Sequence, residues 1–203
     1  DLWVANIDGS GLRQLTKTLE PESSPCWSPD SRTICFASTR DGRAALYTVS
    51  AAGGEMRKLS TGGIIPATEP DWSPDGKWIA FVGKSLHDGV VEDQIFVVST
   101  RYKSIRQVSH IPGGVVNSPV ECARFASNDK IAVLGKDGAI WAVSVLPASF
   151  GNALRLTPAH NSVASNLVVS LDGKTAAYNR IIDGIKQIFV CNIPASSQIS
   201  SGK

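Results

Sequence analysis

The chain repeats itself about every 45 residues, and this period constrains its fold more than any other feature. An aliphatic residue followed by an aromatic one occurs five times, and the aromatics are 44, 49, 45 and 48 residues apart. Each pair opens a short stretch rich in apolar and β-branched residues, which is typical of a β-strand. The pairs are Leu2-Trp3, Leu46-Tyr47, Ile95-Phe96, Ile140-Trp141 and Ile188-Phe189.

A second series of motifs has the chemistry of a tight turn. Proline presets φ for the second position of a turn, aspartate hydrogen-bonds its own backbone, and glycine accepts a positive φ. We therefore assign the aspartate of each motif to turn capping rather than to catalysis. The four motifs are Ser28-Pro29-Asp30-Ser31, Ser73-Pro74-Asp75-Gly76, Ala126-Ser127-Asn128-Asp129 and Ser170-Leu171-Asp172-Gly173.

Each period has the order strand, turn, strand, loop, aromatic strand, glycine turn, strand. Four antiparallel strands repeated in this way predict an all-β fold, a β-propeller of four-stranded antiparallel blades, with less than about 10% helix. We expect one domain over residues 1–203, with residues 195–203 as a frayed tail. The predicted units are 1–16, which is partial, 17–61, 62–109, 110–157 and 158–203.

The segment from Trp72 to Phe81, with the sequence WSPDGKWIAF, resembles the PD40 or WD40-like repeat of TolB-type propellers. The resemblance covers essentially the whole chain. The units around Trp27 and Trp72 follow the family pattern closely, whereas the third unit departs from it at Phe125 and the fourth lacks both the tryptophan and the proline. The resemblance implies a scaffold in the cell envelope or periplasm with a protein or peptide partner at one face of the disc.

The number of predicted strands does not match a closed ring. We count about 17 strands, whereas six four-stranded blades, as in TolB-like proteins, need about 24 and four blades need about 16. We therefore expect about four blades plus a partial one, as a fragment of a larger, six-bladed-like ring. A small ring in which the N-terminal strands complete the last blade stays open as the alternative, because it would cover the exposed sheet edges.

Composition argues against charge-driven partners and against membrane insertion. The chain has 20 Lys and Arg against 18 Asp and Glu, a formal charge of +2, which gives no strong field for nucleic acid. It is 42% hydrophobic but has no apolar run of about 18 residues. Residues 1–6 show no charged segment followed by an apolar one, so we expect no signal peptide in the chain as given.

The four cysteines form no CxxC pair and no group with histidine at zinc-ligand spacing, so we expect reduced thiols rather than structural zinc. If residues 29–32 form a hairpin turn, Cys26 and Cys35 lie opposite each other on paired strands, where a disulfide stays open. The other two cysteines are Cys122 and Cys191.

Common catalytic motifs are missing from the sequence. There is no GxSxG, the nearest segment being Gly83 to His87, which lacks the second glycine. There is also no GxxxxGK[ST], GxGxxG or HExxH. We therefore predict no serine hydrolase site and no phosphate-binding loop within this chain.

The three histidines, His87, His110 and His160, are predicted to lie on one face of the disc. The alternation of four strands places the connection between the second and third strands and the connection between units on the same face. Imidazoles and carboxylates converging there could hold a divalent cation such as Mn or Zn, as in propeller lyases that act on acidic sugars, which this arrangement resembles. The acidic residues expected on that face are Glu69, Asp71, Asp88, Glu92 and Asp93.

We expect the repeating aromatics to be core residues that pack between neighbouring sheets, together with Trp27 and Trp72. Trp78 does not belong to the repeat, because its equivalents are threonine or lysine. We therefore expect Trp78 to be more exposed and to contribute to a contact surface.

Two classes of function follow. The first is a non-catalytic scaffold without a cofactor, which binds a protein or peptide through its variable loops 61–70, 84–93 and 110–120. The second is an enzyme or part of one, either a metal-dependent sugar lyase-like propeller that uses the three histidines or the gating propeller of a prolyl-peptidase-like hydrolase. We favour the scaffold, with candidate binding residues Trp78, Asp88, Glu92, Asp93 and Arg101.

Overall fold

The structure is a computed structural model that describes residues 1–65, 69–116, 123–146, 151–162 and 164–195. The described residues form seventeen strands and no helix, as the sequence predicts. They therefore contain no apolar helix of the length that a membrane crossing requires.

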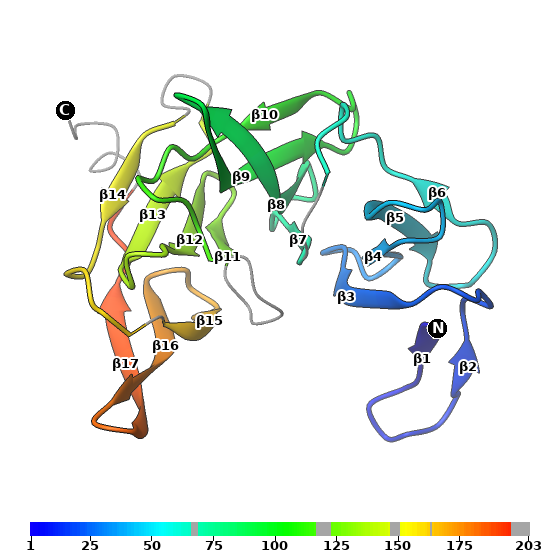
Figure 1. Cartoon of the computed structure of the whole chain (residues 1–203). Helices are drawn as coiled ribbons and strands as arrows, with labels where there is room; N and C mark the ends of the chain where they lie inside the picture. Colours follow the sequence, from blue (N-terminus) through cyan, green and yellow to red (C-terminus); the bar gives the residue numbers. More distant parts are fainter. Residues whose placement is uncertain (66–68, 117–122, 147–150, 163, 196–203) are drawn as a thin grey trace.

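The strands form five antiparallel sheets in chain order, which Figure 1 shows as successive blades along an arc. The half-blade is β1 (Trp3–Val4) and β2 (Arg13–Gln14). Blade I is β3 (Glu22–Trp27), β4 (Thr33–Ser38), β5 (Ala45–Ser50) and β6 (Arg57–Lys58), and blade II is β7 (Asp71–Trp72), β8 (Trp78–His87), β9 (Val90–Ser99) and β10 (Ile105–Gln107). Blade III is β11 (Ala123–Ser127), β12 (Lys130–Leu134), β13 (Ile140–Ser144) and β14 (Ala153–Arg155), and blade IV is β15 (Ser165–Val169), β16 (Thr175–Ile182) and β17 (Ile185–Asn192).

The predicted turn motif has the same hydrogen bonds in blades I, II and IV, and blade III shares its serine–aspartate bond. In blade I, Ser28 Oγ donates to Asp30 Oδ1 at 2.6 Å, and the same carboxylate oxygen accepts the Arg32 N–H at 3.1 Å. The hydrogen bond from Ser28 is the main reason why the pKa of Asp30 lies below its ordinary value. The serine–aspartate bond is repeated in blades II, III and IV, and the aspartates of blades II and IV also accept a backbone N–H of the turn. The capping role is therefore confirmed in blades I, II and IV.

The alignment of the third turn was wrong by one residue. We expected Ala126 in the position of Ser28, but Ser127 makes the equivalent bond to Asp129 and pairs with Lys130. The register shifts between Phe125 and Ser127, so that Ala126 is an extra residue at a β-bulge.

The core lies between the blades, where the repeating aromatics were expected. Phe81 and Phe96 stack with ring centroids 5.8 Å apart in blade II, and Tyr178 and Phe189 do so at the same distance in blade IV. Trp3 and Trp27 were wrongly predicted to be buried: they are 56% and 48% exposed. Trp3 belongs to the half-blade, which has only two strands among the described residues, and Trp27 ends the first strand of blade I.

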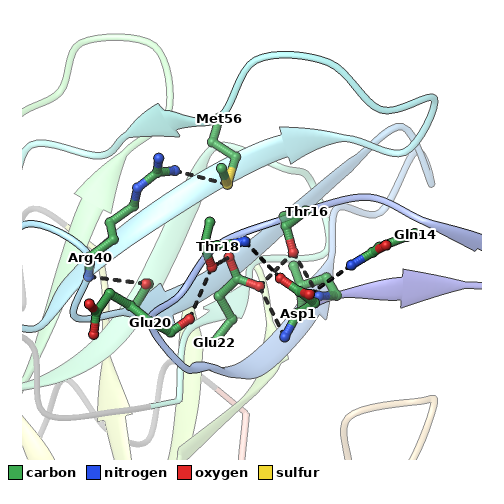
Figure 2. A network of polar contacts seen from close by, with 10 residues as sticks. Asp1, Gln14, Thr16, Thr18, Glu20, Glu22, Arg40 and Met56 are labelled. Atoms are coloured by element: carbon green, nitrogen blue, oxygen red, sulfur yellow. Dashed lines mark hydrogen bonds and ion pairs between the residues drawn. The ribbon is translucent and has the colours of Figure 1, made fainter.

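A polar network ties the half-blade to blade I (Figure 2). Thr16 Oγ1 accepts the Leu2 N–H at 2.7 Å and donates to Glu22 Oε2 at 2.5 Å, and Thr18 Oγ1 lies 2.9 Å from Glu22 Oε1. The side chain of Glu22 is fully buried, so these hydroxyl donors satisfy a carboxylate that water does not reach. The threonine that closes the first repeat unit therefore links two sheets.

Residues 84–93 form a hairpin, not the loop that we expected. β8 and β9 each have ten residues, and they pair from Trp78↔Ser99 to His87↔Val90. The turn consists of Asp88 and Gly89, whose φ values of +47° and +78° are those of a two-residue type I′ turn. Blade II therefore carries a longer hairpin than the other four-stranded blades.

Cys26 and Cys35 lie directly opposite each other on β3 and β4, as predicted, and both are free thiols together with Cys191. The hydrogen bond with Cys35, followed by burial, raises the pKa of the Cys26 thiol. Cys122 and residues 196–203 of the predicted tail lie outside the described residues.

Candidate functional site

The strand order divides the connections between two faces. The upper face carries the turns between second and third strands, such as residues 88–89, and the connections between blades. The lower face carries the turns between first and second strands and between third and fourth strands. Backbone bonds agree with this division, because Thr100 N donates to Lys77 O on the lower face and Lys136 N donates to Gly114 O on the upper face.

The structure brings only some of the predicted binding residues together. Glu92 and His110 line one cavity of about 290 Å³ on the upper face, whereas Asp88 is in the hairpin turn. Arg101 lies in the turn between β9 and β10 on the lower face, where its guanidinium stands over the Tyr102 ring. Trp78 begins β8 and is half-buried against the core, so it is more exposed than the buried repeating aromatics, as expected. Its role in a contact surface stays a prediction.

We call the cavity that Glu92 and His110 line the Glu92 cavity. It is lined by Ser85, Glu92, Gln94, Gln107, His110, Ile111, Pro112 and Gly113. These residues come from β8, β9, β10 and the connection that follows β10. Alternation along the strands explains the set, because Ser85 and Glu92 are directly opposite each other and their side chains share one side of the sheet.

Gln94 holds this cavity in shape. Gln94 is only 3% exposed. Its Oε1 accepts the Ser109 hydroxyl at 2.6 Å and the Ile111 N–H at 3.1 Å, while its Nε2 donates to Ile111 O at 2.9 Å and to Glu92 Oε2 at 3.2 Å. A buried amide with both its oxygen and its nitrogen bonded fixes the neighbouring carboxylate in one place.

Asp93 follows Glu92 in the chain, so its side chain is on the other side of the sheet, where two lysines form ion pairs with it. We call this pair of contacts the Asp93 clamp. Lys84 Nζ lies 2.7 Å from Oδ1 and Lys136 Nζ lies 3.1 Å from Oδ2, so the clamp joins blade II to blade III. Burial alone would raise the pKa of Asp93, but the two lysines outweigh it and hold the pKa below its ordinary value. Glu92 forms no ion pair with any described residue.

Asp93→Asn is expected to lower the free energy of unfolding at pH 7 by about 2 kcal/mol, because a charged hydrogen-bonded group is lost from a buried site. Since the pKa of Asp93 is lowered in the folded state, the clamp is complete above the ordinary value of about 3.9 and is lost as the pH falls through the folded value. Urea unfolding from pH 7 to pH 3 should therefore show a shallower acid limb in the variant. Asp41→Asn, which breaks the exposed pair with Lys58, should change little; equal losses would contradict a buried clamp.

The two histidines with described side chains, His110 and His160, belong to no metal-binding group of described residues. His160 Nδ1 accepts the Ser162 N–H at 3.0 Å in the connection to blade IV, and His110 is at the Glu92 cavity. Among the described residues, no three His, Cys, Asp or Glu lie close enough to hold an ion together. The side chain of His87 lies outside the described part, so the metal site with His87 stays a prediction.

A second cavity, of about 460 Å³, lies where the first strands of blades I to III contact one another. We had not singled out Ser24 or Arg124 among its lining residues, which are Ser24, Pro25, Cys26, Glu69, Pro70, Asp71 and Arg124. Asp71 Oδ2 accepts the Phe125 N–H at 2.7 Å and so joins blades II and III. Ser24 and Glu69 both have a positive φ, and each lies three residues before the tryptophan of its unit. Aligning the units on these tryptophans is the sequence signal that places the two residues at one position of the repeat.

The PD40 family model, described as the TolB beta propeller domain, matches residues 1–110. The chain is 40% identical to the Tol-Pal system protein TolB of Methylococcus capsulatus over 60 residues. The aligned segment is 30% of this chain and 14% of that protein. The chain is also 41% identical to the uncharacterized peptidase YuxL of Bacillus subtilis over 61 residues. This segment is 30% of this chain and 9% of that protein.

Among solved structures, TolB from Acinetobacter baumannii aligns with a TM-score of 0.71 at 22% identity, over 94% of this chain and 47% of that one. An oligogalacturonate lyase in complex with manganese aligns with a TM-score of 0.68 at 12% identity, over 97% of this chain and 56% of that one. At these identities the likeness shows the fold alone, and the chain spans about half the length of these two structures. The family model matches more than half of the chain, and the blades and turn motifs agree with it, so the chain belongs to the TolB β-propeller family.

Proposed function

We propose that the chain is a TolB-like scaffold that binds a protein or peptide partner on its upper face, through the β8–β9 hairpin. The observation that carries the proposal is a pair of exposed aliphatic side chains near the end of this hairpin. Leu86 and Val91 are directly opposite each other on the two strands and are 72% and 60% exposed. Cross-strand aliphatic pairs normally contribute to a core, so an exposed pair on an enlarged hairpin is typical of a contact surface.

The rest of the blade supports the hairpin as a rigid base. Phe81 and Val82, earlier on β8, are buried, and the Asp93 clamp fixes β9 to blade III. A pre-organised surface loses little conformational entropy when a partner binds. One of the relatives, TolB of Methylococcus capsulatus, is a Tol-Pal system protein, so we propose a partner from that system and a place in the cell envelope.

Serine at both Leu86 and Val91 is expected to weaken partner binding at least tenfold, because truncation of an interface anchor costs about 2 kcal/mol or more. The thermal midpoint should stay unchanged, since both side chains are already exposed. Partners captured from a cell-envelope extract by the immobilised chain would be identified by mass spectrometry, and the Kd of each purified partner would be measured by calorimetry.

Leu171→Ser supplies the control. Leu171 is a fully exposed leucine in the lower-face turn of blade IV, so this variant should bind the partner with wild-type affinity. If the double variant and the control bind equally well, the hairpin is not the docking surface.

A further inference from the structure

We propose that the Glu92 cavity binds a basic side chain, lysine or arginine, presented by the partner, with Glu92 as its counter-ion. This inference rests on the proposed function, because it names the chemistry that a partner of the upper face would carry. The argument has three parts: the charge of the cavity, its remaining hydrogen-bonding capacity and its size.

The charge argument compares two neighbouring carboxylates. Asp93 meets two lysine ammonium groups, whereas Glu92 meets none among the described residues. Glu92 is nevertheless half-buried at a polar cavity, and its carboxylate accepts one hydrogen bond from a described side chain, that of Gln94 to Oε2. Half-buried carboxylates are stabilised by a cation. His110 also lines the cavity, but no ion pair joins it or any other described residue to Glu92.

The hydrogen-bonding argument concerns which groups are still open in the cavity. The Ser85 hydroxyl donates to Gln107 Oε1 at 2.7 Å, Gln107 Nε2 donates to Ser109 O at 2.8 Å, and Gln94 Nε2 donates twice. Most donors on the wall are therefore used within the protein. Acceptor capacity remains on Glu92 Oε1, on the Ser85 hydroxyl oxygen and on Gln107 Oε1, each of which has a free lone pair. Ammonium and guanidinium groups carry donors and no acceptor, so they match this set.

The size and the walls fit one side chain. Sites for small-molecule ligands usually have volumes of roughly 300 to 1,000 Å³, so a cavity of about 290 Å³ is at the lower limit of that range. Ile111 and Pro112 line it beside the polar groups. The methylene stem of a lysine or arginine can pack on such apolar wall atoms while its charged end reaches the carboxylate.

The proposal is tested with single side chains as probes, so that no partner is needed. N-acetyl-arginine methylamide and N-acetyl-lysine methylamide would be titrated into the ¹⁵N-labelled protein and followed by NMR. The corresponding citrulline compound, which has nearly the same shape but no charge, is the control probe. We expect saturable shifts at the amides of Ser85, Glu92 and Gln107 for the two cations and at least tenfold weaker binding of citrulline.

Glu92→Gln keeps the size of the side chain and removes its charge. It should weaken binding of the arginine probe at least tenfold without lowering the thermal midpoint, because Glu92 has no ion pair with a described residue to lose. Glu55→Gln, an exposed glutamate in the lower-face turn between β5 and β6, should bind the probe as the wild type does. Equal binding of citrulline, unchanged binding by the Glu92 variant, or shifts that map away from these residues would each overturn the proposal.

The outcome is separable from that of the proposed function. Leu86 and Val91 are one residue away from Ser85 and Glu92 along their strands, so they lie on the other side of the hairpin. If the arginine probe binds but the Leu86 and Val91 double variant captures the partner normally, the cavity stands and the aliphatic docking surface fails. If the partner is captured through the aliphatic pair but the probe does not bind, the cavity inference alone fails.

Discussion

Gly173→Ala is expected to destabilise the protein by about 3 to 5 kcal/mol, one of the largest losses for any single methyl group in this fold. A β-carbon at Gly173 would stand 1.9 Å from the carbonyl oxygen of Ala126, which is backbone and cannot move aside alone. The φ of +67° adds the strain of a left-handed alanine. Urea unfolding followed by circular dichroism would measure the loss as a shift of the midpoint at constant slope.

Gly76→Ala is the matched control for this prediction. Gly76 occupies the same position in the turn of blade II and has a φ of +71°. The nearest atom to its added β-carbon is Pro29 Cγ at 3.5 Å, an ordinary contact, so only the conformational cost of about 1 to 2 kcal/mol is expected. Blade I carries Ser31 at this position with a φ of +58°, so the turn itself accepts a side chain. If the two alanine variants lose the same stability, the close approach of the blade IV turn to Ala126 is not a constraint.

Phe81→Ala is expected to cost about 3 to 5 kcal/mol, because it removes a fully buried ring and leaves a cavity that the rigid sheets cannot fill. Phe81 packs between blades I and II and stacks on Phe96 with the ring planes 21° apart. Both rings belong to the apolar cluster that blades I and II share, so a loss there also loosens the contact between the two sheets. The free energy of unfolding in urea is the measurement.

Phe189→Ala tests whether burial or stacking is responsible. Phe189 stacks on Tyr178 with the same separation of 5.8 Å and the same angle of 21°, but it lies on β17 at the exposed end of the arc and is half-buried. We expect about 1 to 2 kcal/mol for this variant, since less apolar area leaves water when it folds. A loss as large as that of Phe81→Ala would mean that the stacked geometry, rather than burial, decides the cost.

The repeat in the sequence was sufficient to predict the blades. Strand positions follow from alternation and from turn chemistry, both of which act between residues a few positions apart, and the serine and aspartate of each turn are bonded as expected. The third turn was misaligned because a bulge inserts one residue, Ala126, without changing the residue types around it. Bulges leave little trace in a single sequence, since they depend on how two strands pair.

The hairpin was missed for a different reason. Residues 84–93 alternate too weakly between apolar and polar types to predict strands, although Asp88-Gly89 is a strong signal for a two-residue turn and could have revealed it. What stabilises these strands is largely distant in sequence. Lys136 of blade III reaches Asp93 across 43 positions, and no local pattern encodes that contact.

The sequence by itself therefore determined the all-β class, the four-stranded period, the turn chemistry and the family, because each depends on interactions within one unit. Only the tertiary structure decided which of the two adjacent carboxylates, Glu92 or Asp93, forms ion pairs with lysines. Glu92 and Asp93 point to opposite sides of one strand, and the neighbouring blade places a lysine beside Asp93 while a neutral amide stands beside Glu92. The difference arises from contacts between blades, because the packing of one blade on the next decides which charged side chains meet. A repeat motif in the sequence does not show how its copies are arranged in space.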